Sequence, residues 1–462
     1  MAGFSDQHPK VINVFTLVMI NVIAVDSLRT LPISAEYGLS LVFYYVLGGL
    51  IFFIPVALVA AELATTWPAR GGLYVWVREA FGTRLAFFTI WLQWIYNVVW
   101  YPTILAVIAA ALAYLINPAL ANQKFYVLCT VLTIFWGATI VNCFGMRVSS
   151  LISVIGALFG TLVPMLFIIS LAIYWLYSGH ASHVHFNWHN LTPNLSHIGN
   201  LVLFSNILFG LIGVEMSGVH AEAVQNPQRA YPRAILYSTL IIFTTLMLAS
   251  LSIAIVIPQL QLSLVSGLID AFAIFFSTYG FNWMTPVIAV LIIIGGISGV
   301  STWVIGPTKG LLVAAEDHAL PALFSHVNRF DAPAPLLILQ AIIVTILSSV
   351  FILMDTINAS YWMLSALTAQ LALMVYVIMF AAVIRLRYTQ ADKARPFRIM
   401  GGNRGIWLIA GVGLVTCLLT IGIGFVPPNQ FQIGNVFLFE IFLICGMVLF
   451  GLIPFWVLHR RP

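Results

Sequence analysis

The sequence carries very little charge. Only 7% of its 462 residues are Asp, Glu, Lys or Arg, whereas 61% are hydrophobic, and the mean hydropathy is +1.04. A soluble protein of this length carries far more charge, so the composition excludes a soluble chain and indicates a polytopic helical membrane protein. The net charge of +5 is interpreted below as a feature of membrane topology, and we expect no binding to nucleic acid.

Cysteines are also few, and they lack the spacing of metal ligands. All four fall in or at the ends of apolar runs: Cys129, Cys143, Cys417 and Cys445. We treat them as small apolar residues and expect no disulfide. The stretch from Gly179 to His189, with His197 beyond it, holds several histidines that could bind a metal or titrate near pH 6.5. Because partner carboxylates and thiols are missing there, we favour a solvated loop and expect no metal site.

Signatures of processing and of enzymatic chemistry are absent from the sequence. The N-terminus lacks the ordered regions of a cleaved signal peptide. We find no nucleophile motif, no phosphate-binding loop and no paired histidines for a haem. We therefore expect neither enzymatic activity nor a cofactor.

Long apolar runs are present along the whole chain. About 20 apolar residues cross a bilayer as a helix, and we count twelve such runs. Their ranges are 12–34, 39–64, 85–115, 125–144, 149–178, 198–220, 234–257, 285–314, 335–354, 360–384, 405–426 and 434–458. No soluble domain fits between them, so we expect one all-α transmembrane domain over residues 1–462.

The positions of Lys and Arg predict the orientation in the membrane. With twelve spans, every Lys and Arg except Lys124 and Arg29 falls on one side. The positive-inside rule then places both termini in the cytoplasm. Adding or losing one span would scramble this bias, so the bias also supports the count of twelve.

The first apolar run contains ionisable residues where a plain membrane anchor has none. Asp26 and Arg29 lie in its middle, close to Thr30, Pro32 and Ser34. One charge at the bilayer centre costs about 2.5–3.5 kcal/mol if it faces lipid. A segment that lines a protected, wet cavity avoids this cost, and Pro32 favours a break in the helix. We therefore predict a broken first helix that forms a substrate or ion site.

The sixth apolar run shows a similar interruption five spans later. It contains Gly210, Gly213 and Gly218 together with the carboxylate of Glu215. Interrupted spans at matching positions of two halves indicate a transporter site. We expect a LeuT-type arrangement of five spans plus five inverted spans, with helices 1 and 6 broken and two extra helices. The first repeat covers about residues 11–178, the second about 198–384, and the additional helices about 405–458.

Several sequence blocks resemble one transporter superfamily. They are residues 209–215 (FGLIGVE) continuing to 221–234 (AEAVQNPQRAYPRA), 38–43 (GLSLVF) with 53–58 (FIPVAL), 61–64 (AELA) with 71–77 (GGLYVWV), and 301–310 (STWVIGPTKG). The first pair is similar to the sixth-helix signature of the amino acid–polyamine–organocation (APC) transporters. The other blocks resemble the glutamate/γ-aminobutyrate antiporter branch, and the similarity extends over nearly the whole chain.

The resemblance implies an amino acid site at the two breaks. The first break would hold the substrate carboxylate and the sixth-helix break its amine, since free N–H and C=O groups face the ligand there. The implied substrate-binding residues are Val25, Asp26, Ser27 and Arg29 at the first break, Phe209, Gly210, Ile212 and Gly213 at the second, and Asn97 and Trp303 beside them. Phe209 matches an aromatic gate, although it could be an ordinary packing residue. Asn97 and Trp303 match substrate contacts or cavity wall, and Asn97 could instead bond to a neighbouring helix.

Two features of this constellation stay open at the sequence level. Many relatives have a glycine-rich run at the first break, whereas this chain has Asp26-Ser27-Leu28-Arg29. Arg29 could clamp a carboxylate, or Asp26 and Arg29 could pair with each other and only stabilise the break. Glu215, a carboxylate at membrane depth, is our first candidate for proton coupling or pH sensing, and Asp26 is the second. The alternative is that Glu215 is a permanently hydrogen-bonded structural residue.

These interpretations together predict an amino acid transporter of the inner (plasma) membrane. We expect an exchanger or a proton-coupled permease that works by alternating access, as a monomer or homodimer. Its partners would be an amino acid substrate, the lipid bilayer and, in the coupled case, protons. The alternatives are a transporter-fold amino acid receptor or sensor without turnover, and a polyamine or amine exchanger.

Overall fold

The computed structural model describes residues 12–68, 71–144, 156, 158–193, 196, 198–216, 218, 224–330, 332–430 and 433–459. Within these ranges, regular structure is helical apart from one isolated bridge between Ile12 and Val224. A chain this apolar folds into helices because each backbone group then finds its hydrogen-bond partner inside its own segment.

Eleven helices in the described ranges are long and apolar enough to cross a membrane. They are 38–66 (ending in α4, Ile54–Thr66), α6 (Thr83–Ile116), α7 (Lys124–Cys143), 158–177 (ending in α9, Val163–Tyr177), 198–216 (containing α11, Phe204–Gly210), 228–256 (in α12, Pro227–Val256), α14 (Met284–Glu316), 334–353 (α15, Ala334–Ser348, and α16, Val350–Leu353), α17 (Ile357–Thr389), α18 (Gly402–Ile423) and α19 (Val436–His459). The first of the twelve expected spans is not among them, because it is interrupted. It consists of α1 (Val14–Val25), the 3-10 turn η1 (Leu28–Thr30) and α2 (Leu31–Ala35).

Shorter helices connect the long ones. They are α5 (Leu73–Phe81), α10 (Trp188–Leu191) and α13 (Gly267–Tyr279), and two π-helical segments, η3 (Gly49–Phe53) and η5 (Leu158–Leu162), lead into α4 and α9. The short helix α3 (Leu41–Gly48) precedes η3.

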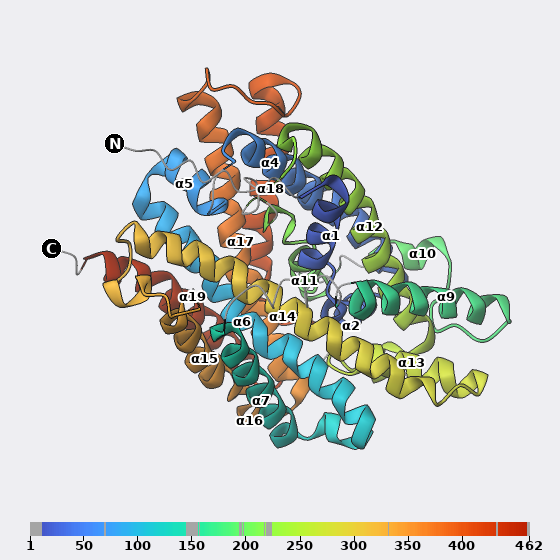
Figure 1. Cartoon of the computed structure of the whole chain (residues 1–462). Coiled ribbons are helices and arrows are strands. Elements are labelled where there is room, and N and C mark those ends of the chain that lie inside the picture. Colours follow the sequence, from blue (N-terminus) through green and yellow to red (C-terminus); the bar gives the residue numbers. More distant parts are fainter. Residues whose placement is uncertain are drawn as a thin grey trace.

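Three long helices form the centre of the bundle. α6 packs against both α14 and α17, and the three lie in the middle of Figure 1. About 78% of the apolar window of α6 and of α17 is buried inside the protein, against 22% of that of α19. The central helices therefore line internal space, whereas α19 presents most of its apolar surface outward.

The break in the first span lies at Asp26 and Ser27. Both residues are extended, with φ/ψ of −63°/110° and −127°/118°, between the end of α1 and the start of η1. Pro32 does not sit at the break itself; it occupies the first turn of α2. Proline is tolerated there because the first N–H groups of a helix have no intrahelical partner.

The second break follows Gly210 at the end of α11. Gly213 adopts φ = +128°, a conformation that favours glycine, and helical geometry resumes at Val214. A Cβ atom on Gly213 would lie 2.8 Å from the carbonyl oxygen of Ala24, so the two breaks touch each other. The predicted pairing of two interrupted helices is thus present in the fold.

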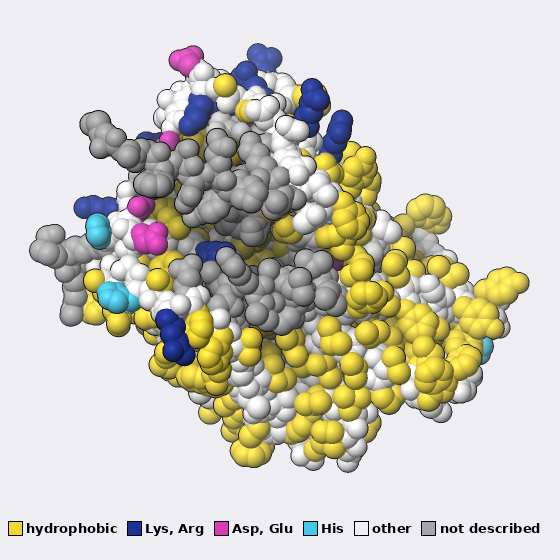
Figure 2. All heavy atoms as spheres, viewed as in Figure 1, with side chains coloured by type: hydrophobic (Ala, Val, Ile, Leu, Met, Phe, Trp, Pro, Cys, Tyr) yellow, Lys and Arg dark blue, Asp and Glu magenta, His cyan; other side chains and the backbone are white. Residues whose placement is uncertain are grey.

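Charged side chains gather at one end of the molecule. Figure 2 shows Lys and Arg mostly at the top and along the left side of the view, whereas hydrophobic side chains cover most of the lower and right-hand parts. Among the described residues, the buried Glu62 of α4 pairs with Arg387 and Arg395.

Candidate functional site

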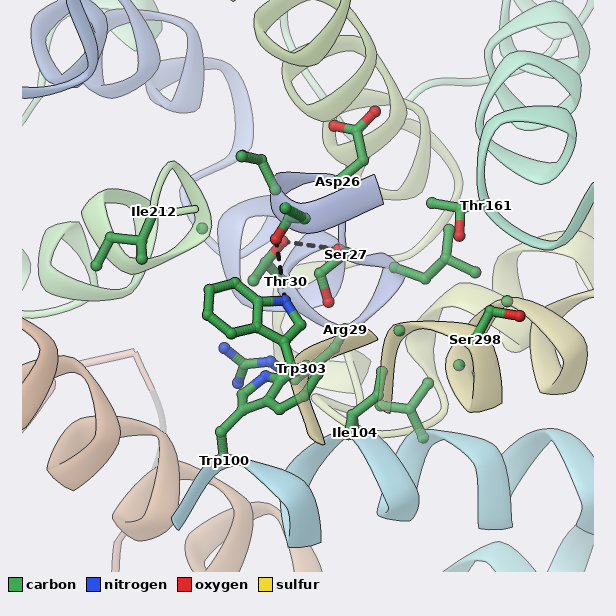
Figure 3. A pocket seen from close by; sticks show the side chains of 18 of the residues that line it. Asp26, Ser27, Arg29, Thr30, Trp100, Ile104, Thr161, Ile212, Ser298 and Trp303 are labelled. Carbon is green, nitrogen blue, oxygen red and sulfur yellow. Dashed lines mark hydrogen bonds between the residues drawn. The ribbon is translucent and has the colours of Figure 1, made fainter. Parts of the chain in front are cut away.

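A small cavity lies where the two breaks meet α6 and α14 (Figure 3). Its free volume is about 50 Å³, room for only a few water molecules. Nine of the ten residues predicted to bind substrate line it: Val25, Asp26, Ser27, Arg29, Asn97, Phe209, Gly210, Ile212 and Trp303. Gly213, the tenth, packs against Ala24 just outside the lining.

Arg29 is the central polar group of this site. Its side chain is fully buried, and Nη1 donates to Ser365 Oγ on α17 at 3.0 Å. Its guanidinium lies 4.9 Å from the ring centre of Phe209 and 5.9 Å from that of Tyr361. Nε and Nη2 have no hydrogen-bond partner among the described residues. A buried guanidinium with two free donors is suited to bind a carboxylate.

Asp26 turns away from Arg29. Its two carboxylate oxygens accept from Thr245 Oγ1 on α12, at 3.3 and 3.1 Å. Figure 3 shows the carboxylate pointing away from Trp303 and the rest of the labelled polar groups. Among the described residues no ion pair joins Asp26 to Arg29, so the two side chains connect the break to different helices. The sequence left open whether Asp26 and Arg29 pair with each other, and in this structure they do not.

Backbone groups at the first break are available for a ligand. In the described part of the chain, no hydrogen bond is assigned to the N–H groups of Ser27 and Leu28. The carbonyl oxygen of Ala24 accepts from Trp303 Nε1 at 3.1 Å, and that of Ser27 accepts from Thr30 Oγ1 at 2.9 Å. At this break, the backbone N–H groups of Ser27 and Leu28 are therefore available as donors, whereas the carbonyl oxygens of Ala24 and Ser27 already accept hydrogen bonds.

Aromatic rings form a cluster that includes Phe209, a ring next to the Arg29 guanidinium. Tyr96 on α6 meets both Phe209 and Trp303 edge-on, with ring centres 6.4 and 6.3 Å apart. Trp100, one turn after Tyr96, lies 6.4 Å from Trp303. These rings keep water away from Arg29 and strengthen its interaction with an anion. Phe209 lies within this cluster, where a gating residue is expected, and its gating role stays a prediction.

Asn97 and Glu215 make local hydrogen bonds. Asn97 lines the cavity, yet its Nδ2 donates to the Gln93 carbonyl oxygen one turn back at 2.7 Å. Glu215 does not line the cavity; its carboxylate accepts from the N–H of Gly213 at 3.2 Å and lies near Tyr376 of α17. Glu215 thus stabilises the second break from behind the cavity.

Some lining residues were not predicted from the sequence. Trp100, Ile104, Thr161, Ser298 and Gly299 line the cavity, and Ser365 and Tyr361 hold Arg29 from α17. Tyr361 and Ser365 are four residues apart, so they share one helix face. This spacing of two hydroxyl groups in an apolar run was the signal that could have identified α17 as part of the site.

Comparisons with known proteins agree with this architecture. The profile of the family described as "Amino acid permease" matches residues 12–450. An uncharacterized transporter of Legionella pneumophila is 61% identical over 98% of this chain and 97% of its own length. A glutamate/γ-aminobutyrate antiporter of Lactococcus lactis is 31% identical over 98% of this chain and 92% of its own. A probable agmatine/putrescine antiporter of Lactococcus lactis is 24% identical over 84% and 82%.

Proposed function

Because the chain belongs to the amino acid permease family of the APC superfamily, we propose that it transports an amino acid across the inner (plasma) membrane by alternating access. Family membership makes it a multi-pass membrane transporter of amino acids or amines. The proposal is narrower in two respects: the substrate is an amino acid, and transport proceeds by exchange or by proton coupling.

The free donors of Arg29 are the observation that carries this proposal. Nε and Nη2 are buried, lie between the two helix breaks and have no described partner. A buried guanidinium left unpaired is costly, and a substrate carboxylate removes that cost. The N–H groups of Ser27 and Leu28, which have no hydrogen-bond partner among the described residues, are further donors at the same break. Since the cavity holds only a few waters, the lining must move apart to admit a substrate, as alternating access requires.

The positive charge of Arg29 argues against a function as an exchanger of diamines. A diamine carries no carboxylate for Arg29, and the two nearby carboxylates serve other groups. Asp26 accepts from Thr245, and Glu215 accepts from the N–H of Gly213. A diamine would therefore meet the Arg29 cation, while the one lining carboxylate, Asp26, points away from Trp303 and the other labelled polar groups.

Transport in proteoliposomes tests the proposal directly. The purified protein is expected to take up radiolabelled amino acids, and internal substrate should accelerate uptake if it is an exchanger. Binding of amino acids without uptake or exchange would support a receptor instead. Uptake of diamines but of no amino acid would contradict the assigned substrate.

Arg29 variants test the carboxylate site. We expect Arg29→Lys, which keeps the charge but loses the forked donors, and Arg29→Ala to weaken apparent affinity about 10- to 100-fold, as for hydrogen bonds to a charged group. Asp26→Asn serves as the matched control, because Asn keeps an oxygen acceptor for Thr245, and it should keep near-normal affinity. Equal losses in Asp26→Asn and Arg29→Ala would argue for a purely structural role of both.

Glu215 is our first candidate for the coupling proton, with Asp26 as the second. Support comes from its burial beside the second break, where gain of a proton would weaken its hold on Gly213 N–H. In Glu215→Gln the pH profile of transport should flatten between pH 5 and 8. An unchanged pH profile together with normal folding would leave Glu215 a structural residue.

A further inference from the structure

Gly299 occupies a distinctive position in the cavity wall. It lies on α14 one turn before Trp303 and lines the cavity. A Cβ atom built on Gly299 meets no described atom within 4 Å. On the neighbouring Gly296 a Cβ would lie 2.6 Å from Ile108, and on Gly295 it would lie 2.1 Å from the Gly160 carbonyl oxygen. Gly295 and Gly296 are thus glycine because helices pack there, whereas no described atom occupies the space beside Gly299.

The part of the lining beside that space is apolar or carries hydroxyl groups; the two charged lining residues are Arg29 and Asp26, and the Asp26 carboxylate points away from Trp303. Ile104, Val107 and Ile108 of α6 and Ile292 of α14 line the cavity, together with the hydroxyl groups of Thr161 and Ser298. Figure 3 shows Ile104, Thr161 and Ser298 on one side of the view and the Trp303 and Trp100 rings on the other. Arg29 is the one cation among the lining residues, and it is fully buried with two unpartnered donors.

We propose that Gly299 sets the size limit for the substrate, and that the substrate is an amino acid with a compact, uncharged side chain. This inference rests on the proposed function, since it assumes that the substrate carboxylate lies at Arg29. One guanidinium satisfies one carboxylate, so a second carboxylate on the side chain would enter an apolar region without a partner. A short aliphatic or hydroxyl side chain suits this lining of apolar and hydroxyl groups.

A size series of ligands tests this assignment. The probes are glycine, alanine, serine, valine, leucine, phenylalanine, glutamate and γ-aminobutyrate, measured as competitors of radiolabelled alanine in proteoliposomes and as stabilisers of the protein in detergent. In the unmodified protein, alanine and serine should compete at least 10-fold better than phenylalanine, glutamate and γ-aminobutyrate. Stronger competition by glutamate than by alanine would overturn the proposal.

Substitutions at Gly299 then test the position itself. Gly299→Ala and Gly299→Val should progressively weaken the binding of valine and leucine. For Gly299→Val the loss should be at least 10-fold, while the binding of glycine stays within about 3-fold of normal. Gly137→Val, on the outward face of α7 where a Cβ also meets no described atom, is the matched control and should leave every ligand unchanged. Equal weakening of all ligands by Gly299→Ala, or no effect of Gly299→Val, would overturn the role of Gly299.

The two readouts separate this inference from the proposed transport. Size-graded binding in detergent that changes with Gly299 supports the inference even if no uptake occurs, in which case only the transport proposal fails. Intact uptake with no dependence on ligand size overturns the inference alone. A monodisperse elution profile for each variant establishes that the comparison is made on folded protein.

Discussion

At the residue scale, two carboxylates pair with arginines in very different surroundings. Glu62 is 1% exposed and receives two hydrogen bonds from Arg387, at 2.6 and 2.5 Å, and one from the N–H of Ile399 at 2.9 Å. Asp317 pairs with Arg78 at 2.8 Å, and both side chains are more than a third exposed. Burial should decide how much the loss of each pair destabilises the protein, because a charge left without a partner in the interior cannot recover its hydration.

Glu62→Gln is therefore expected to destabilise the protein strongly. It leaves Arg387 and Arg395 without a counter-ion, and breaking a buried pair in this way costs about 3–5 kcal/mol. Asp317→Asn is the matched control, since an exposed pair contributes at most about 1 kcal/mol. Thermal unfolding in detergent, followed by tryptophan fluorescence, compares the two. Similar melting temperatures for both variants would mean that the Glu62 cluster does not hold α4 to α17.

At the element scale, the crossing of η5 and α14 depends on two glycines. A Cβ atom on Gly295 would lie 2.1 Å from the carbonyl oxygen of Gly160, and one on Gly160 would lie 2.2 Å from the N atom of Gly295. Both obstacles are backbone, which cannot rotate aside as a side chain can. The two helices approach this closely only because neither residue has a side chain.

Gly295→Ala should accordingly force the segment Leu158–Leu162 away from α14. Overpacking of this kind costs about 1–3 kcal/mol or more, so a lower melting temperature and reduced substrate binding are expected. Gly422→Ala, in α18 where a Cβ meets no described atom, is the control. It should be neutral or slightly stabilising, because alanine is favoured over glycine inside a helix by about 1 kcal/mol. A melting temperature of Gly295→Ala at or above that of Gly422→Ala would contradict the close crossing.

The element scale also shows what the sequence could and could not predict. The apolar runs, the break near Asp26 and the glycines after Phe209 are local signals, and the structure has the helices and both breaks there. The directions of side chains at the breaks depend on neighbours far along the chain. Asp26 meets Thr245 and Arg29 meets Ser365, which are 219 and 336 residues away. No pattern within residues 24–32 could specify these partners.

At the scale of the whole molecule, the site lies where the most buried helices cross. α6 carries Tyr96 and Trp100 of the aromatic cluster, α17 carries Ser365 and Tyr361 beside Arg29, and both helices are largely enclosed by the other helices. The first break reaches outward from this centre to α12 through Asp26 and to α14 through the Trp303 hydrogen bond. In the proposed alternating access, these two contacts would couple a movement of the first span to α12 and α14.

The orientation of the whole molecule in the membrane can be measured from two loops. Asn122, beside Lys124, follows α6, and Ala391 follows α17 next to Lys393 and Arg395. Seven candidate spans separate these exposed positions, and an odd number places them on opposite sides. The positive-inside rule assigns Ala391, near most of the basic residues, to the cytoplasm.

Single cysteines at Asn122 and Ala391, in a variant whose four native cysteines are replaced by serine, test this assignment. A membrane-impermeant maleimide applied to intact cells should label Asn122→Cys and spare Ala391→Cys, which should react only after the membrane is permeabilised. Since two further spans, α18 and α19, follow Ala391, the end of α19 would lie on the cytoplasmic side as well. Labelling of Ala391→Cys but not of Asn122→Cys in intact cells would show the opposite orientation. Labelling of both positions in intact cells would contradict the number of spans between them.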